Sequence, residues 1–125
     1  GVTLKAEGDG VMTGSDALIY RLIFNLTENA VKYNRPGGSV WVCVTQETEK
    51  LLIRVSDTGR GIPEEFQRSI FQPFFRVDKS RSREYGGAGL GLSLVWEIAD
   101  LHGGCVWVEE SSDKGTTIAV ELPIQ

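Results

Sequence analysis

A long amphipathic segment, residues 16–33, is followed closely by two strand-like runs, and few fold classes accommodate both. Apolar side chains recur along it at intervals of three and four residues, the pattern of a helix with one buried face: Leu18, Ile19, Leu22, Ile23, Leu26, Ala30 and Tyr33. The turn-forming sequence at 34–38, Asn-Arg-Pro-Gly-Gly, should end this helix. Residues 39–46 and 50–57 then predict a β-hairpin.

Shorter segments extend this pattern towards both ends of the chain, which at 125 residues has the length of one domain. Four further strands are predicted, at residues 2–6 and 10–13 around a Gly8-Asp9-Gly10 turn, and at about 104–110 and 116–122. Pro63 suits the first turn of a short helix that ends near Ile70. A second long helix is expected over about 90–102, with Gly103 as its C-cap. This ββαββααββ order predicts a sheet covered by helices on one face.

Composition and charge exclude several classes of protein. With 41% apolar and 24% charged residues the chain is an ordinary globular one. Its net charge of −4 argues against nucleic-acid binding through bulk positive charge. No apolar run approaches the length of a membrane span, and the first residues do not form a signal peptide, so we expect neither direct membrane contact nor secretion. Cys43 and Cys105 are expected to be free thiols in a reducing cytosol.

Two amides and an ammonium share one face of the first helix. Asn25 and Asn29 are four residues apart and Lys32 follows three later, so all three lie on one stripe. Amide oxygens are suitable ligands for Mg²⁺, and a lysine beside them suits the phosphates that the metal carries. A merely solvated outer face explains this stripe equally well.

A second candidate, Asp57 to Pro63, reads Asp-Thr-Gly-Arg-Gly-Ile-Pro at the end of an apolar strand. The carboxylate of Asp57 can accept a hydrogen bond from a ligand amino group. Gly59 and Gly61 allow the backbone to approach a flat ring closely, and Ile62 offers an apolar contact. Taken alone, these residues are more typical of a simple turn.

Two more segments remain ambiguous by themselves. Residues 86–92, Gly-Gly-Ala-Gly-Leu-Gly-Leu, precede a predicted helix, where exposed N–H groups can bind an anion. They match neither a dinucleotide-binding fingerprint nor a P-loop. Residues 71–76 hold three phenylalanines and Arg76, which indicate either a local core or an apolar latch beside a basic loop at 76–89.

In chain order, five segments resemble the N, G1, F, G2 and G3 boxes of sensor histidine kinases. They are residues 25–34 (NLTENAVKYN), 57–62 (DTGRGI), 71–78 (FQPFFRVD), 87–92 (GAGLGL) and 115–117 (GTT). The match covers nearly the whole chain, and the ordered set is far more specific than any one box. The resemblance implies the Bergerat (GHKL, HATPase_c) fold: an α/β (α+β) two-layer sandwich with about three helices on one face of a mixed, mostly antiparallel sheet. It also implies an ATP lid at about 77–88.

The same resemblance implies Mg²⁺ and ATP (or ADP) as ligands and assigns roles to residues. Asn29 would bind the metal, with Asn25 supporting the metal or its water, and Lys32 would bind phosphate. The adenine or its ribose would lie against a second set: Tyr33, Asp57 as acceptor for the amino group, Gly59, Gly61 and Thr116 (the last two through water), and Ile62. The phosphates would be held by the amides of Gly89, Leu90, Gly91 and Leu92, with Arg76 assisting when the lid closes. Gly87 would also belong to the nucleotide-binding residues.

The resemblance also implies partners and a location. His102, the only histidine, stands at a predicted helix C-terminus, where its charge suits the helix dipole. The phosphoacceptor would instead lie on a separate helical dimerization domain absent from this chain, with a response regulator as an indirect partner. We expect the chain to be a monomer from the cytoplasmic portion of a membrane-anchored sensor.

Three alternatives stay open. An ATP-hydrolysing switch like DNA gyrase, or an anti-sigma serine kinase, would usually carry a glutamate base where this chain has Asn25, which cannot accept a proton. A plain nucleotide-binding module is the third.

Overall fold

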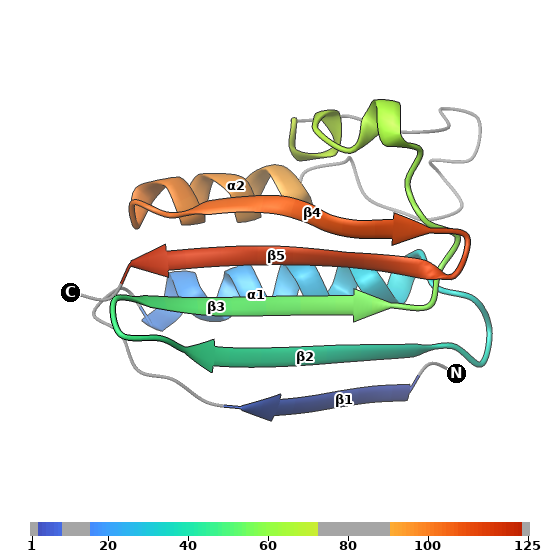
Figure 1. Cartoon of the computed structure of the whole chain (residues 1–125), viewed down its shortest axis with the longest axis horizontal. Coiled ribbons are helices and arrows are strands. Elements are labelled where there is room, and N and C mark those ends of the chain that lie inside the picture. The colour runs from blue at the N-terminus through green and yellow to red at the C-terminus, as the bar shows by residue number, and fades with distance from the viewer. Residues whose placement is uncertain (1–2, 9–15, 73–90, 124–125) are drawn as a thin grey trace.

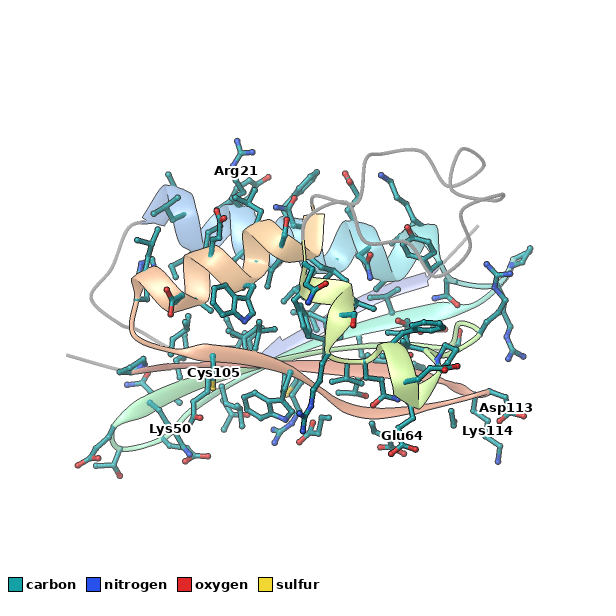
Figure 2. All side chains as sticks on the ribbon, turned by 90° about the horizontal axis from the view of Figure 1, so that it is seen from above. Arg21, Lys50, Glu64, Cys105, Asp113 and Lys114 are labelled. Atoms are coloured by element: carbon teal, nitrogen blue, oxygen red, sulfur yellow. The ribbon has the colours of Figure 1, made fainter. Side chains whose placement is uncertain are left out.

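The computed structural model describes the backbone of residues 3–8, 16–72 and 91–123, and the side chains from residue 17 onward within these ranges. Its elements are β1 (Thr3–Gly8), α1 (Asp16–Lys32), β2 (Ser39–Gln46), β3 (Lys50–Asp57), the 3₁₀ turns η1 (Glu64–Phe66) and η2 (Ser69–Phe71), α2 (Gly91–Leu101), β4 (Cys105–Ser112) and β5 (Gly115–Pro123). Both α-helices cover the same face of one sheet (Figures 1 and 2). Within these ranges no helix has the length and apolar character that spanning a membrane requires.

The sheet has five strands in the order β1-β2-β3-β5-β4. β1 runs parallel to β2, and the other neighbouring pairs are antiparallel. Parallel neighbours need a crossover connection, and α1 lies within it. The prediction of a two-layer sandwich with a mixed, mostly antiparallel sheet is confirmed.

The core lies between the sheet and the two helices. Along β3, Leu51, Ile53 and Val55 are buried and belong to the same apolar cluster as the inward side chains of α1 and α2. Successive side chains of a strand point to opposite faces. Asp57, two residues after Val55, therefore points to the helix-covered side of the sheet.

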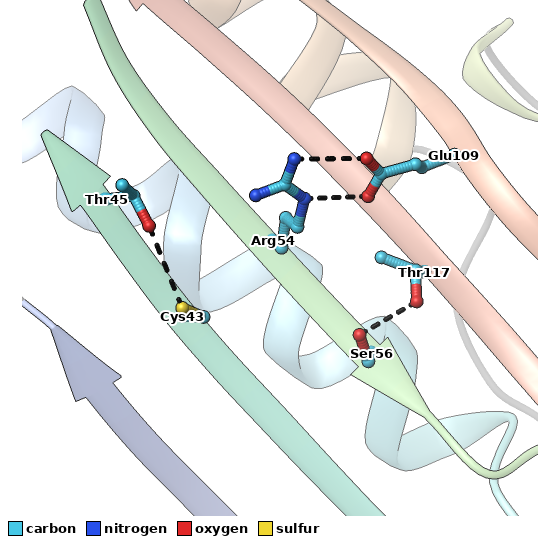
Figure 3. A network of polar contacts seen from close by, with 6 residues as sticks. All are labelled: Cys43, Thr45, Arg54, Ser56, Glu109 and Thr117. Carbon is cyan, nitrogen blue, oxygen red and sulfur yellow. Dashed lines mark hydrogen bonds and ion pairs between the residues drawn. The ribbon is translucent and has the colours of Figure 1, made fainter. Parts of the chain in front are cut away.

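The face of the sheet away from the helices carries polar contacts (Figure 3). Arg54 donates two hydrogen bonds to the carboxylate of Glu109, over 2.8 and 3.1 Å. The hydroxyl oxygens of Ser56 and Thr117 lie 2.8 Å apart. These contacts join β3 to β4 and β5 without contributing to the core.

Several sequence predictions differ from the structure near element ends. The hairpin strands match in both ranges, and the two helices end one residue earlier than expected. The helix expected from Pro63 to about Ile70 is instead the pair of turns η1 and η2, so the described residues contain two α-helices and not about three. The Nε2 of Gln67 donates to the Ile62 carbonyl, over 3.0 Å, and a segment this short does not repay helix nucleation.

Two more expectations concern the ends of the described ranges. β1 continues through Gly8, where a turn was expected. The strand expected at 10–13 and the lid at 77–88 lie outside the described residues.

A matched pair of leucines tests where the core lies. Leu22 on α1 is fully buried, whereas Leu101 at the end of α2 is 73% exposed. We expect Leu22→Ala to lower the free energy of unfolding by about 2–5 kcal/mol, because it leaves a cavity. Leu101→Ala should change it by about 0.5 kcal/mol or less. Urea unfolding measures both, and equal losses would contradict this placement of α1.

Candidate functional site

Asp57 ends β3 at the edge of the core and uses its two carboxylate oxygens differently. Oδ1 accepts the backbone N–H of Gly59, over 2.8 Å, and that of Thr116, over 3.2 Å. Oδ2 makes no hydrogen bond to any residue the structure describes, and can accept one from a ligand. Burial raises the pKa of the Asp57 carboxyl, while the two N–H groups act in the opposite direction.

The loop after Asp57 passes close to the end of α1. A Cβ on Gly59 would lie 2.5 Å from the carbonyl oxygen of Tyr33 and 3.0 Å from Asp57 Oδ1. Gly61 has a φ of +83°, which side-chain-bearing residues rarely adopt. A Cβ on Gly61 would also collide with the carbonyl oxygen of Ser112, so the close approach of backbone to backbone requires both glycines. The sequence analysis expected them to allow approach to a flat ring, which stays a prediction.

Hydroxyl groups from the β4–β5 end hold the other side of this loop. Ser111 Oγ accepts the backbone N–H of Ile62, over 2.8 Å, and lies 2.8 Å from Thr116 Oγ1. Thr116 is 5% exposed and pairs with Asp57 across the sheet. Sequence reasoning missed Ser111, because its position between the strands predicted at about 104–110 and 116–122 gave no sign of the bond to Ile62.

The polar stripe lies on α1, the helix whose C-terminal end packs beside this loop. Asn25 and Asn29 are half-buried, and neither side chain makes a hydrogen bond to a described residue. Asn25 Nδ2 is buried with no partner in this part of the chain. Buried polar atoms are almost always paired in native proteins, so an unpaired one indicates a missing ligand or water. Lys32 Nζ lies 3.3 Å from Glu28 Oε1, an exposed pair one turn apart.

The remaining predicted residues lie partly inside and partly outside the described ranges. Ile62 is half-buried against the core, and Tyr33 is exposed just after α1. Gly91 and Leu92 form the first turn of α2, exposed and half-buried respectively. The other predicted residues lie outside the described ranges: Arg76, Gly87, Gly89 and Leu90.

A hollow elsewhere on the molecule is lined by residues including Glu47, Lys50, Cys105 and Glu121. Lys50 Nζ lies 2.7 Å from Glu121 Oε1, so the lysine neutralises the charge of this carboxylate. Lys50 and Asp57 are at opposite ends of β3, and Lys50 lies far from Asp113 of the β4–β5 turn (Figure 2). This hollow is not part of the Asp57 site.

Comparison with known proteins gives a consistent result. Residues 14–125 match the family model described as histidine kinase-, DNA gyrase B-, and HSP90-like ATPase. The circadian input-output histidine kinase CikA of Synechococcus elongatus is 43% identical over 105 residues, which cover 84% of this chain and 14% of CikA. The chain spans between 14% and 28% of the length of the curated relatives it matches.

Solved structures agree with this match. The mycobacterial sensor histidine kinase MprB superposes with a TM-score of 0.84 at 29% identity, covering 99% of this chain and 84% of that one. The histidine kinase ThkA, in a complex with the response regulator TrrA, gives 0.78 at 26% identity, covering 99% of this chain and 34% of that one.

Asp57→Asn tests the electrostatics of the site without nucleotide. The variant keeps an oxygen for Gly59 and Thr116 but cannot ionise. Because the folded-state pKa of Asp57 is raised, its ionisation lowers stability above that pKa and has no effect below the unfolded value. We expect the Tm of the variant relative to the parent to rise as the pH increases above about 4, the ordinary value for an aspartate. A relative fall over this range would contradict a raised pKa.

Proposed function

Because the chain belongs to the family of histidine kinase-, DNA gyrase B-, and HSP90-like ATPases, we propose that it binds Mg-ATP and transfers the γ-phosphoryl group to a histidine on a separate helical domain. The observation that carries the nucleotide assignment is the divided role of the Asp57 carboxylate. One oxygen is fixed by backbone N–H groups and the other is left as an acceptor beside a close-packed glycine loop.

This acceptor favours adenine over guanine. The amino group of adenine is a donor that Asp57 Oδ2 can accept from. Guanine presents a carbonyl at the corresponding position, and two facing acceptors repel. Thr116 and the backbone of Gly61, held beside Asp57, would complete the contact to the base through water.

The stripe on α1 fits the metal and phosphate end of the nucleotide. A half turn of the Asn25 amide would exchange its buried, unpaired nitrogen for an oxygen, and Asn29 offers a second amide oxygen. Mg²⁺ prefers oxygen ligands, and in nucleotide sites these come from the protein and from the phosphates. When bound, the metal would neutralise part of the phosphate charge. Lys32 can exchange Glu28 for a phosphate, since their ion pair is exposed.

Phosphoryl transfer is favoured over hydrolysis by two features of the described residues. Asn25 cannot remove a proton from water, although it occupies the position of the glutamate base in ATP-hydrolysing members. His102 Nδ1 lies 2.8 Å from the Ile98 carbonyl oxygen at the end of α2, which gives this histidine a structural role. The acceptor histidine is therefore expected on another domain.

Relatives support the wider assignment. CikA and MprB are named histidine kinases, and ThkA is seen with a response regulator, which supports such a protein as an indirect partner. We place the domain in the cytoplasm, where its two free cysteines remain reduced, as part of a membrane-anchored sensor. In isolation we expect a monomer, which gel filtration tests.

Asp57→Asn also tests the nucleotide assignment. The amide puts a donor where adenine presents its own donor, so calorimetry should show ATP binding weakened by roughly 10- to 150-fold. GTP should bind the parent weakly. Ser56→Ala, which removes a hydroxyl on the opposite face of the sheet, is the control and should bind ATP like the parent. Unchanged ATP binding by Asp57→Asn would refute the adenine assignment.

Transfer in trans tests the kinase assignment. With γ-labelled ATP, the isolated domain should not label itself, but should label the dimerization domain of its own kinase on histidine, an acid-labile product. Asn29→Asp or Lys32→Ala should reduce this labelling by at least about tenfold, whereas His102→Gln should leave it nearly intact. Labelling of His102 would contradict an acceptor on another domain, and rapid ATP hydrolysis without a partner would support the hydrolytic alternative.

A further inference from the structure

The end of α1 and the end of β3 are joined by the side chains of Asn34 and Thr58. Both residues lie in the segments that resemble the N and G1 boxes, but the proposed function gives neither of them a role. We propose that Asn34 and Thr58 are positioning residues that set the spacing between the two halves of the nucleotide site. One half is the carboxylate of Asp57, and the other is the amide stripe of α1. The inference rests on the proposed function and deepens it.

Asn34, two residues after α1, uses both ends of its amide. Its Nδ2 donates to the carbonyl oxygen of Ser39, the first residue of β2, over 2.8 Å. Its Oδ1 accepts the hydroxyl of Thr58 and the backbone N–H of Arg35, each over 2.8 Å. The half-buried amide therefore joins the helix end to two strands.

Thr58 completes the connection from the other side. Its hydroxyl donates to Asn34 and accepts the backbone N–H of Ser39, over 2.9 Å. Its own N–H donates to the carbonyl oxygen of Ser39, over 3.2 Å. Because Thr58 directly follows Asp57, these bonds hold the backbone that carries the carboxylate against the end of α1.

The Asn34–Thr58 junction leaves little space for movement. A Cβ on Gly38 would lie 2.5 Å from Thr58 Oγ1 and would also collide with the amide of Asn34. Gly59 is in similarly close contact with the Tyr33 carbonyl. Arg35 adds a further connection, since its guanidinium donates to the carbonyl oxygen of Asp113. Tight packing of this kind holds one spacing and excludes others.

A fixed spacing matters because one nucleotide must contact both halves at once. The contacts to the base and to the metal-bound phosphates both contribute fully to affinity only if the two sites are already the right distance apart for one nucleotide before it binds. A loosened junction would leave each half able to bind its own part of the ligand. It would reduce the additional affinity of a ligand that contacts both halves at once. The expected defect is therefore confined to ligands that reach both halves.

The matched variants are Thr58→Val, which removes the hydroxyl with little change of shape, and Thr58→Ser, which keeps it. Asn34→Ala tests the amide, and Ser56→Ala is the control for loss of a hydroxyl elsewhere on β3. Two ligands are compared. Adenosine contacts only the half of the site that contains Asp57, whereas the Mg²⁺ complex of a non-hydrolysable ATP analogue contacts both halves. Titrations followed by NMR measure both affinities, and thermal unfolding confirms that each variant is folded.

Thr58→Val and Asn34→Ala should bind adenosine within about twofold of the parent and bind the Mg²⁺–analogue complex about five- to tenfold more weakly. Thr58→Ser should restore the parent values, and Ser56→Ala should match them. Equal losses for both ligands, or no loss for either, would overturn the positioning role. A parent that binds the complex no better than adenosine would instead contradict the proposed function.

Discussion

The pairing of β3 with β5 determines whether the proposed nucleotide site can form. Its register places Asp57 opposite Thr116, so that the N–H of Thr116 reaches Asp57 Oδ1. A slip of one residue would turn the carboxylate to the face that carries Arg54 and Ser56. The apolar residues at alternate positions of β3 prevent that slip, because it would expose Ile53 and Val55 to water. The same alternation that builds the core therefore aims the carboxylate.

Polar groups with incomplete bonding are concentrated where a ligand is expected. Of the buried side-chain nitrogen and oxygen atoms in the described ranges, only Asn25 Nδ2 lacks a partner. Asp57 Oδ2 is likewise without one. Elsewhere in these ranges, Asn34, Thr58, Ser111 and Thr116 bond to one another or to backbone. Natural sequences tend to break such local rules at functional sites.

The sequence predicts the hairpin and both long helices because their patterns are local and repeated over many residues. It also identifies Asp57, Asn25 and Asn29 as candidate site residues, since a motif and a helical spacing can both be recognised in the amino-acid sequence. It fails at residues 63–70, where a segment too short to repay helix nucleation forms two 3₁₀ turns, the second of which buries Ile70 and Phe71.

The junction of Asn34 with Thr58 could not be predicted from the sequence in the same way. These two residues are 24 positions apart, and their contact exists only once β2 and β3 have paired. The bond between Ser111 and Ile62, 49 positions apart, is a second example. Contacts of this kind depend on tertiary structure. Asn34 and Thr58 also occur in sequence segments that are equally typical of ordinary turns.

Two ion pairs differ in how easily a ligand could displace one partner: Arg54 with Glu109, and Lys32 with Glu28. Arg54 and Glu109 form a two-bond pair on the open face of the sheet, where nothing in the proposed reaction requires movement. Lys32 and Glu28 form a single exposed contact, worth about 0.3–0.5 kcal/mol for such helix pairs. A phosphate can displace Glu28 at little cost, whereas Asp57, fixed by two N–H groups, stays in place. In the proposed function, the contact to adenine is thus already formed in the folded domain, and the contact to phosphate forms when the nucleotide binds.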